Sequence, residues 1–220
     1  MEIYPSVYLI KDIFVNQYLL SGKDGLLLID TGVGGNQANI LNTVRLSGHQ
    51  PADIKTIIIT HADSDHYGSL AAIKALTNAT TFATEIEALA IQAGRSSREL
   101  KPRGLRKILF SVGRPMMKIK PSQVETTLKG GEVFSTLGGL EVLLTPGHTP
   151  GHISLYSPTQ RLLFAGDSIR VVHGVPAPSG EEMTWDMAKA KESFEMQLAL
   201  DPIAIFAGHG VWFKEKSKGL

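Results

Sequence analysis

The sequence contains no cysteine, and it also lacks long apolar runs and a strong charge of either sign. Without cysteine, disulfide scaffolds, thiolate metal sites and a cysteine nucleophile are excluded. No apolar run approaches the roughly 20 residues that a membrane-spanning helix needs, so no membrane span is expected. The 22 basic and 21 acidic side chains nearly cancel, and this balance gives no indication of a nucleic-acid partner.

The start of the chain does not have the pattern of a signal peptide. Residues 1–5 show neither the basic region nor the apolar stretch of a signal peptide. Together with the absence of disulfides, this leads us to expect a cytoplasmic protein. A length of 220 residues is enough for a sizeable core, and we predict a single domain over residues 1–220.

Apolar patterning predicts strands that alternate with helices. Strands are expected at 6–10, 14–20, 26–30, 54–60, 140–144, 153–156, 162–165 and 203–207. Helices are expected at 36–46, 70–76 and 185–200, where apolar residues recur at helical spacing. This order predicts an α/β fold, with several polar motifs placed directly after strands.

A basic segment at about 85–121 is predicted as a helical insertion, interrupted by glycine and proline. It carries Arg95, Arg98, Lys101, Arg103, Arg106, Lys107, Arg114, Lys118 and Lys120. The segment could form a lid that attracts an anionic substrate, or its apolar residues could enclose an acyl chain. A solvated helix face and a homodimer contact are the other interpretations.

One short run contains most of the candidate metal ligands. The run His61-Ala62-Asp63-Ser64-Asp65-His66 places two imidazoles and two carboxylates within six residues. His148, Asp167 and His209 each follow a predicted apolar strand, in loops rich in glycine or proline. A single histidine in such a loop is more often a surface or hydrogen-bonding residue. The whole set, gathered at one edge of a sheet sandwich, predicts a site for divalent metal.

These motifs resemble those of the metallo-β-lactamase superfamily. The order is His-x-Asp-x-Asp-His, then Pro-Gly-His, Gly-Asp and Gly-His, and Ile29-Asp30-Thr31-Gly32 is similar to a further motif of that family. The interval from His148 to Asp167 resembles that of the glyoxalase II and lactonase branches. The resemblance implies an αββα sandwich of two mixed β-sheets flanked by helices, with metals at one edge of the sheets.

The resemblance also implies roles for individual residues. Two divalent metals are expected: His61, Asp63 and His148 hold the first, Asp65, His66 and His209 hold the second, and Asp167 bridges them. Asp30 is expected to orient the ligands by hydrogen bonding, and His152 either does the same or caps backbone groups in its loop.

Asp63 departs from the family pattern, which has histidine at that position. Zinc is the expected metal, but a carboxylate suits harder ions, so iron or manganese stays open. The substitution could also leave the first metal position weak and the second dominant. The flavodiiron branch has a carboxylate at this position as well, although it is a glutamate.

The function that the resemblance implies is metal-dependent hydrolysis. A metal-bound hydroxide would attack an ester, thioester, lactone or related bond of a small molecule, and Asp65 would orient it and shuttle its proton. Tyr67 and His173 are candidates for the substrate pocket. The alternatives are a packed aromatic at a helix start for Tyr67 and a solvent-facing loop residue for His173.

Two other functions remain open. One is an iron-dependent oxidoreductase on the same fold, flavodiiron-like or persulfide dioxygenase-like, although the chain has no flavodoxin-like domain to deliver electrons. The other is a metal-binding module without catalysis. Iron with a visible chromophore would favour the first, and the absence of metal-dependent turnover would favour the second.

Overall fold

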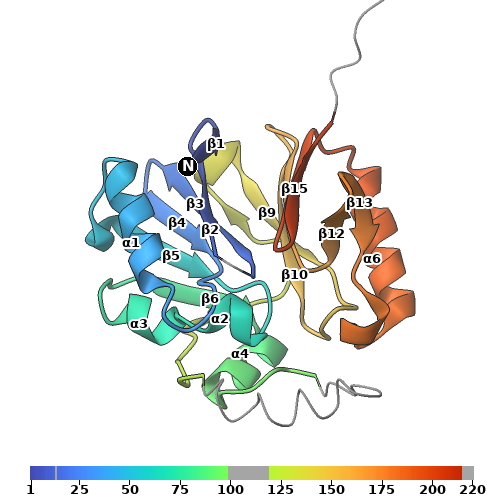
Figure 1. Ribbon diagram of the computed structural model, residues 1–220, viewed down its shortest axis with the longest axis horizontal. Helices are drawn as coiled ribbons and strands as arrows, with labels where there is room; N and C mark the ends of the chain where they lie inside the picture. Colours follow the sequence, from blue (N-terminus) through green and yellow to red (C-terminus); the bar gives the residue numbers. More distant parts are fainter. Residues whose placement is uncertain (13, 99–118, 215–220) are drawn as a thin grey trace, which may run out of the picture.

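Two mixed β-sheets form the centre of the computed structural model, which describes residues 1–12, 14–98 and 119–214. The first sheet has the strand order β1-β2-β3-β4-β5-β6-β7 and the second the order β15-β14-β11-β10-β9-β8. In Figure 1 the sheets face each other, with α1 and α3 outside the first and α6 outside the second. The predicted αββα sandwich is thereby confirmed.

The strands of the first sheet are β1 (Glu2–Tyr4), β2 (Val7–Lys11), β3 (Asn16–Gly22), β4 (Gly25–Ile29), β5 (Ile54–Ile58), β6 (Thr80–Thr84) and β7 (Thr126–Leu128). Those of the second are β8 (Val133–Phe134), β9 (Leu140–Leu144), β10 (Ile153–Ser157), β11 (Leu162–Gly166), β14 (Ala204–Ala207) and β15 (Gly210–Phe213). A separate hairpin consists of β12 (Ile169–Val172) and β13 (Val175–Pro178).

The helices lie between these strands in the chain. They are α1 (Gln37–Leu46), α2 (Ser64–Tyr67), α3 (Leu70–Lys74), α4 (Glu85–Gln92) and α6 (Met187–Ala199). Short 3-10 turns are η1 (Pro51–Asp53), η3 (Thr136–Gly138) and η4 (Glu181–Met183). None of the helices in the described residues is both long enough and apolar enough to cross a membrane.

Strand β4 shows why its apolar run is continuous. Leu26 and Leu28 belong to the apolar cluster that contains residues of α1 and α3, whereas Leu27 and Ile29 belong to the cluster between the sheets. Because successive side chains of a strand point to opposite faces, a strand covered on both sides must be apolar at every position.

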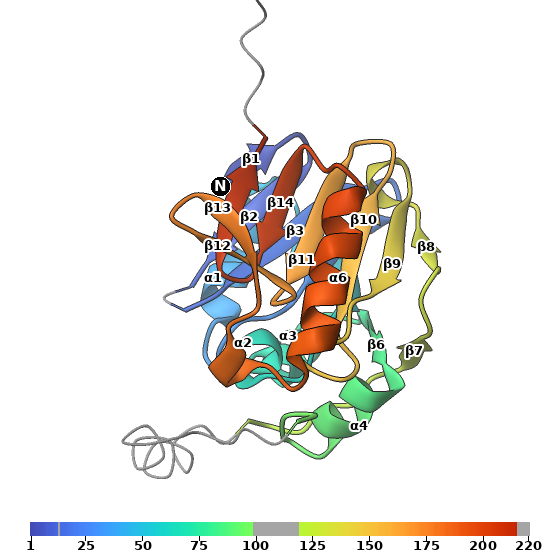
Figure 2. The same ribbon diagram turned by 90° about the vertical axis from the view of Figure 1, so that its right-hand side faces the viewer.

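The second sheet is built in the same way. Phe164 and Phe206 lie in the cluster between the sheets, and Leu163 and Ile205 lie in a cluster with Phe194 of α6. Figure 2 shows α6 lying across this outer face. The sheet is therefore apolar on both sides as well, as the sequence of its central strands predicts.

Strand direction brings the polar motifs to one edge. β4 and β5 are parallel in the first sheet. β11 and β14 are parallel in the second, and β9 shares their direction because both β9 and β11 are antiparallel to β10. The carboxyl ends of these strands lead into the loops that carry Asp30, His61, His148, Asp167 and His209.

The predicted insertion at about 85–121 is described only in part. It begins with α4, whose Ala88 and Ile91 pack in the cluster on the outer side of the first sheet. Residues 99–118, with most of the basic side chains, lie outside the described residues. The insertion as a lid or dimer contact stays a prediction.

Candidate metal centre

Side chains from four strand ends converge on one point. His61, Asp63 and His148 present ligand atoms that all lie within 4.8 Å of one another. We refer to these three residues as the first set. Asp65, His66 and His209, the second set, meet the same limit, as do His61, His66 and Asp167. The structure thus brings together all seven residues predicted as metal ligands.

Hydrogen bonds fix the orientation of His61 and His66. The Thr60 hydroxyl donates to Asp30 Oδ2 at 2.8 Å, so its oxygen accepts from Nδ1 of His61 at 3.0 Å. Nδ1 of His66 donates to the same Asp30 oxygen at 2.8 Å. Both imidazoles therefore carry their ring proton on Nδ1 and direct the Nε2 lone pair towards the cluster, as metal ligation requires.

Asp30 has a strained backbone at the end of β4. Its φ of 60° lies in the left-handed region, which costs energy for a residue other than glycine. Its side chain is buried and also accepts a hydrogen bond from the Thr60 amide at 2.8 Å. These contacts hold the carboxylate against His66, and the orienting role of Asp30 stays a prediction.

His152 supports the loop of Asp167. Its Nδ1 contacts the Thr145 hydroxyl at 2.8 Å, and its Nε2 accepts the Asp167 amide at 3.1 Å. Burial lowers the pKa of His152 well below its ordinary value, which keeps the ring neutral and able to accept. His152 therefore positions the bridging candidate through its backbone.

Glycine is required where two of these loops approach each other. A Cβ on Gly208 would lie 2.2 Å from Oδ1 of Asp167 and 2.9 Å from Cε1 of His66. Because glycine has no side chain, Asp167 and His66 have room beside Gly208, and His209 is the next residue in the chain. Nε2 of His209 lies 3.3 Å from Oδ2 of Asp167, and His209 is 46% exposed, so the cluster opens to solvent on this side.

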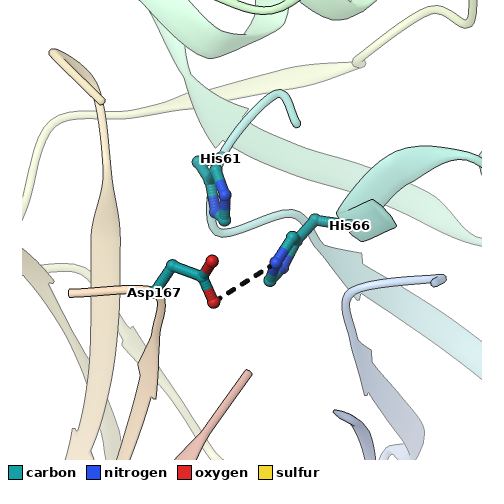
Figure 3. A group of neighbouring side chains, drawn as sticks. All are labelled: His61, His66 and Asp167. Carbon is teal, nitrogen blue, oxygen red and sulfur yellow. Dashed lines mark ion pairs between the residues drawn. The ribbon is translucent and has the colours of Figure 1, made fainter. Parts of the chain in front are cut away.

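Polar atoms without hydrogen bonds show that the cluster fits a metal. Nε2 of His61, Nε2 of His66 and Oδ1 of Asp167 are buried, and none makes a hydrogen bond among the described residues, although Nε2 of His66 and Oδ1 of Asp167 face each other at 3.3 Å as an ion pair. Figure 3 shows these three side chains pointing towards one another from the two sheets. Buried polar atoms without hydrogen bonds are costly, and a divalent cation would satisfy all three.

The charges within the cluster also favour the binding of a metal. Burial alone would lower the pKa of His66, but Asp167 and Asp30 raise it well above its ordinary value. Burial alone would raise the pKa of Asp63 and of Asp167, yet their histidine neighbours, and Arg98 beside Asp63, hold both pKa values well below normal. Both carboxyl groups are therefore ionised at neutral pH, and a metal would displace the His66 proton.

Asp63 accepts hydrogen bonds from two residues of the segment after α4. Its Oδ1 accepts a hydrogen bond from the Ser96 hydroxyl at 2.7 Å, and its Oδ2 accepts from the Arg98 guanidinium. The same Arg98 nitrogen, Nη2, lies 3.0 Å from Nε2 of His148. Arg98 is 6% exposed and so lies inside the cluster.

Sequence reasoning missed Glu87, which joins two of the ligand loops. This carboxyl group is fully buried and accepts hydrogen bonds from the Ala62 amide at 2.8 Å and the Gly151 amide at 2.9 Å. The Thr149 hydroxyl donates to it at 2.7 Å. The only available signal was an acid among the buried apolar positions of α4.

The two residues proposed for a substrate pocket differ in their surroundings, and their role there stays a prediction. Tyr67 is fully buried in the cluster under α1 and α3, and its hydroxyl donates to the Arg95 carbonyl at 3.3 Å. His173 is exposed in the turn between β12 and β13, with a φ of 50°. Within the described chain, no hydrogen bond or ion pair connects His173 to the metal cluster.

Comparison with known proteins relates this chain to a protein family. The sequence profile of the metallo-beta-lactamase superfamily matches residues 10–209. The chain is 30% identical to the Bacillus subtilis protein YobT, with 93% of this chain and 86% of YobT covered. It is 27% identical to the probable metallo-hydrolase YflN of Bacillus subtilis, with 88% and 78% covered.

Two further similarities extend the comparison. A hydroxyacylglutathione hydrolase of Bartonella henselae is 32% identical over 56% of this chain and 40% of its own length. A metallo-beta-lactamase family protein of Thermus thermophilus, TTHA1429, superposes with a TM-score of 0.73 at 27% identity, covering 96% of this chain and 76% of the other.

The chain belongs to the metallo-β-lactamase superfamily. The resemblance inferred from the motifs is thereby confirmed.

Proposed function

We propose that this protein is a metal-dependent hydrolase that cleaves an ester, thioester, lactone or related bond of a small molecule. The observation that carries the proposal is the group of three buried ligand atoms on His61, His66 and Asp167, which converge and make no hydrogen bond within the described residues. Such atoms, together with charged carboxylates, suit a divalent ion that is held on one side and open on the other. The exposed His209 and the half-buried Asp65 lie on the open side.

When bound there, a divalent metal supplies Lewis acidity, which lowers the pKa of a coordinated water towards 7 and polarises a substrate carbonyl. The protein's own residues orient the reacting groups and transfer the proton. His66 and His61 keep their Nε2 lone pairs directed at the cluster through Asp30 and Thr60. Asp30 thereby fixes the geometry in which the reacting groups meet.

Asp65 is proposed to move the proton. It stands in the first turn of α2, next to His66, and its carboxylate lies with His66 and His209 in the second set. As the oxygen of the attacking water bonds to the acyl carbon, Asp65 takes the water proton. It then gives that proton to the leaving alcohol or thiol as the acyl C–O or C–S bond breaks.

The relatives support this class of bond without identifying the substrate. The name of the Bartonella relative, hydroxyacylglutathione hydrolase, denotes hydrolysis of an acylated glutathione, and YflN is named a probable metallo-hydrolase. The match to the Bartonella protein covers only 40% of its length, so the thioester is one candidate among several. Zinc is the proposed metal.

A panel of thioesters, lactones and simple esters tests the proposal, with protein loaded with Zn²⁺ or with Mn²⁺. We expect turnover of at least one class, and we expect Asp65→Ala to reduce it by about 100-fold or more because general acid–base transfer contributes 10²–10⁴. Ser64→Ala, on the same turn, is the matched control. Near-wild-type rates in Asp65→Ala would refute the role of Asp65.

One observation favours the iron-dependent oxidoreductase as a second candidate, namely the carboxylate of Asp63 where a histidine is usual. In the structure, however, both Asp63 oxygens already accept hydrogen bonds from Ser96 and Arg98. Iron bound in stoichiometric amount, with a visible chromophore, would support this candidate over hydrolysis.

A further inference from the structure

Arg98 contacts two of the three residues of the first set. Its Nη2 donates to Oδ2 of Asp63 and lies 3.0 Å from Nε2 of His148. Arginine cannot act as an acceptor and keeps its charge at any accessible pH. The contact with His148 is therefore a hydrogen bond donated to the Nε2 lone pair, the same lone pair that a metal would need.

The rest of His148 agrees with this assignment. Its Nδ1 lies 3.1 Å from the Ser179 hydroxyl, which can accept the Nδ1 proton of the tautomer that the Arg98 contact requires, and its Nε2 also lies 3.3 Å from Oδ2 of Asp63. The geometry thus gives Arg98 a carboxylate oxygen and an imidazole nitrogen, which are metal-ligand atoms, from two different loops. In the first set, Nε2 of His61 makes no hydrogen bond within the described residues and lies 3.6 Å from Oδ2 of Asp63.

Arg98 is held in the cluster through Nη2, whereas its Nε and Nη1 make no hydrogen bond within the described residues. The side chain is fully buried, and the Ser96 hydroxyl, two residues earlier, donates to the other oxygen of Asp63 at 2.7 Å. Asp63 stands in the family position of a histidine, and an aspartate pairs with a guanidinium as a neutral imidazole does not. The unusual ligand and the buried arginine therefore explain each other.

We propose that the Arg98 guanidinium occupies the first metal position, so that the protein binds a single divalent metal through the second set and Asp167. A guanidinium and a divalent cation in one buried pocket would repel each other strongly, and both would need the same lone pairs. The second set is free of this competition, because the structure shows no contact of Arg98 with Asp65, His66 or His209. The inference rests on the proposed function only in assuming that the cluster binds metal.

Metal stoichiometry tests the inference. Full-length protein is stripped with a chelator, dialysed against Zn²⁺ and separately against Mn²⁺, and analysed for bound metal per chain. We expect one ion in the wild type and two in Arg98→Met, which removes the charge but keeps an apolar side chain of similar length. Ser96→Ala, which loses a contact with Asp63 but no charge, should keep one ion.

A second variant keeps the test decisive if Arg98→Met does not fold. His148→Ala removes a ligand of the first set only, and we expect it to retain one ion, whereas His66→Ala should retain none. Two ions in the wild type, or loss of the single ion in His148→Ala, would overturn the inference while leaving the proposed hydrolase intact. One ion in the wild type and two in Arg98→Met, without hydrolysis of any substrate, would support the inference and refute the proposed function.

Discussion

His66 lies between two carboxylates, and this position controls both its proton and its metal affinity. Nδ1 lies 2.8 Å from Oδ2 of Asp30, and Nε2 lies 3.3 Å from Oδ1 of Asp167. Without a metal, a proton on Nε2 of His66 compensates the charge of Asp167, and His209, whose pKa is raised by its hydrogen bond with Asp167, lies 3.3 Å from the other carboxylate oxygen. The metal-free protein should therefore respond to pH in a characteristic way.

We predict that the metal-free protein loses stability as the pH is raised above about 6.5. The folded-state pKa of His66 is raised by Asp167 and Asp30, so the protonated ring stabilises the folded state fully below the unfolded pKa of about 6.5. That stabilisation is lost as the pH rises through the raised folded pKa. Denaturant unfolding of chelator-treated protein between pH 6 and pH 9 measures the slope.

The variant His66→Gln serves as the control, because it cannot titrate. Its free energy of unfolding should change less over this pH range than that of the wild type. An equal slope in the two proteins would show that His66 is not responsible.

Glu87 carries a second prediction at this scale. Its buried carboxyl group accepts from the Ala62 and Gly151 amides, so it connects the loop of His61 with the loop of His148. In Glu87→Gln, one acceptor oxygen becomes an NH₂ group that faces a backbone donor. We expect the free energy of unfolding to fall by about 2–3 kcal/mol.

Chemical denaturation of Glu87→Gln measures this change, with Glu85→Gln as the matched control. Glu85 stands in the same first turn of α4 but is exposed, so its amide variant should stay within about 0.5 kcal/mol of the wild type. Equal stability of the two variants would contradict the connecting role of Glu87.

The sequence predicted the candidate metal ligands far better than the residues that hold these ligands in place. His61, Asp65, His66 and Asp167 belong to short motifs whose residue types and spacing metals require. Glu87 belongs to no motif, since an acid in a helix normally faces solvent. Arg98 was indistinguishable from the other basic residues of its segment, because only the fold shows that it points into the cluster.

At the scale of elements, β11 and β14 bring two loops into contact at Gly208. The Gly208 amide donates to the Gly166 carbonyl at 2.8 Å, and its carbonyl accepts from the Asn16 amide at 2.8 Å. These bonds fix the loop from both sides. The space beside Gly208 is filled by the side chains of Asp167 and His66.

We predict that Gly208→Ala weakens metal binding by about 10- to 100-fold, the usual cost of disturbing groups that orient metal ligands. Its Cβ would meet the Asp167 carboxylate at 2.2 Å and force it out of place. Competition with a chromophoric chelator measures the affinity.

Gly174→Ala is the control for this prediction. Gly174 has a φ of +79° but nothing within 4 Å of an added Cβ, so alanine there should cost only the backbone strain of about 1–2 kcal/mol. Its metal affinity should be unchanged. A Gly208→Ala protein with wild-type affinity would show that the loop adapts.

Most strands buried on both faces were predictable, whereas the edge elements and the threonine-rich interior strand β6 were not. The segment 140–144 forms β9 within the predicted bounds, and 54–60 contains β5. In contrast, β7 is a short strand of two threonines and a leucine, and β13 contains two prolines. Such strands lie at sheet edges or in hairpins, where few apolar side chains are needed and the pattern is lost.

At the scale of the whole molecule, the sandwich determines where chemistry is possible. Asp30 and His61 follow strands of the first sheet, whereas His148, Asp167 and His209 follow strands of the second. The amide of Ile153 in β10 donates to the Thr60 carbonyl at 3.1 Å and so connects the sheets beside the cluster. The metal centre therefore depends on correct packing of both sheets.

The central claim is that this centre hydrolyses acyl bonds only when it holds a metal. The most direct test is the rate of thioester hydrolysis by one wild-type sample before chelation, after chelation and after addition of Zn²⁺ or Mn²⁺, with lactone and ester substrates assayed in parallel. We predict that chelation abolishes turnover and that one of the two metals restores it. Equal turnover in the stripped and the reloaded protein, or no turnover in either for all three bond types, would contradict the account.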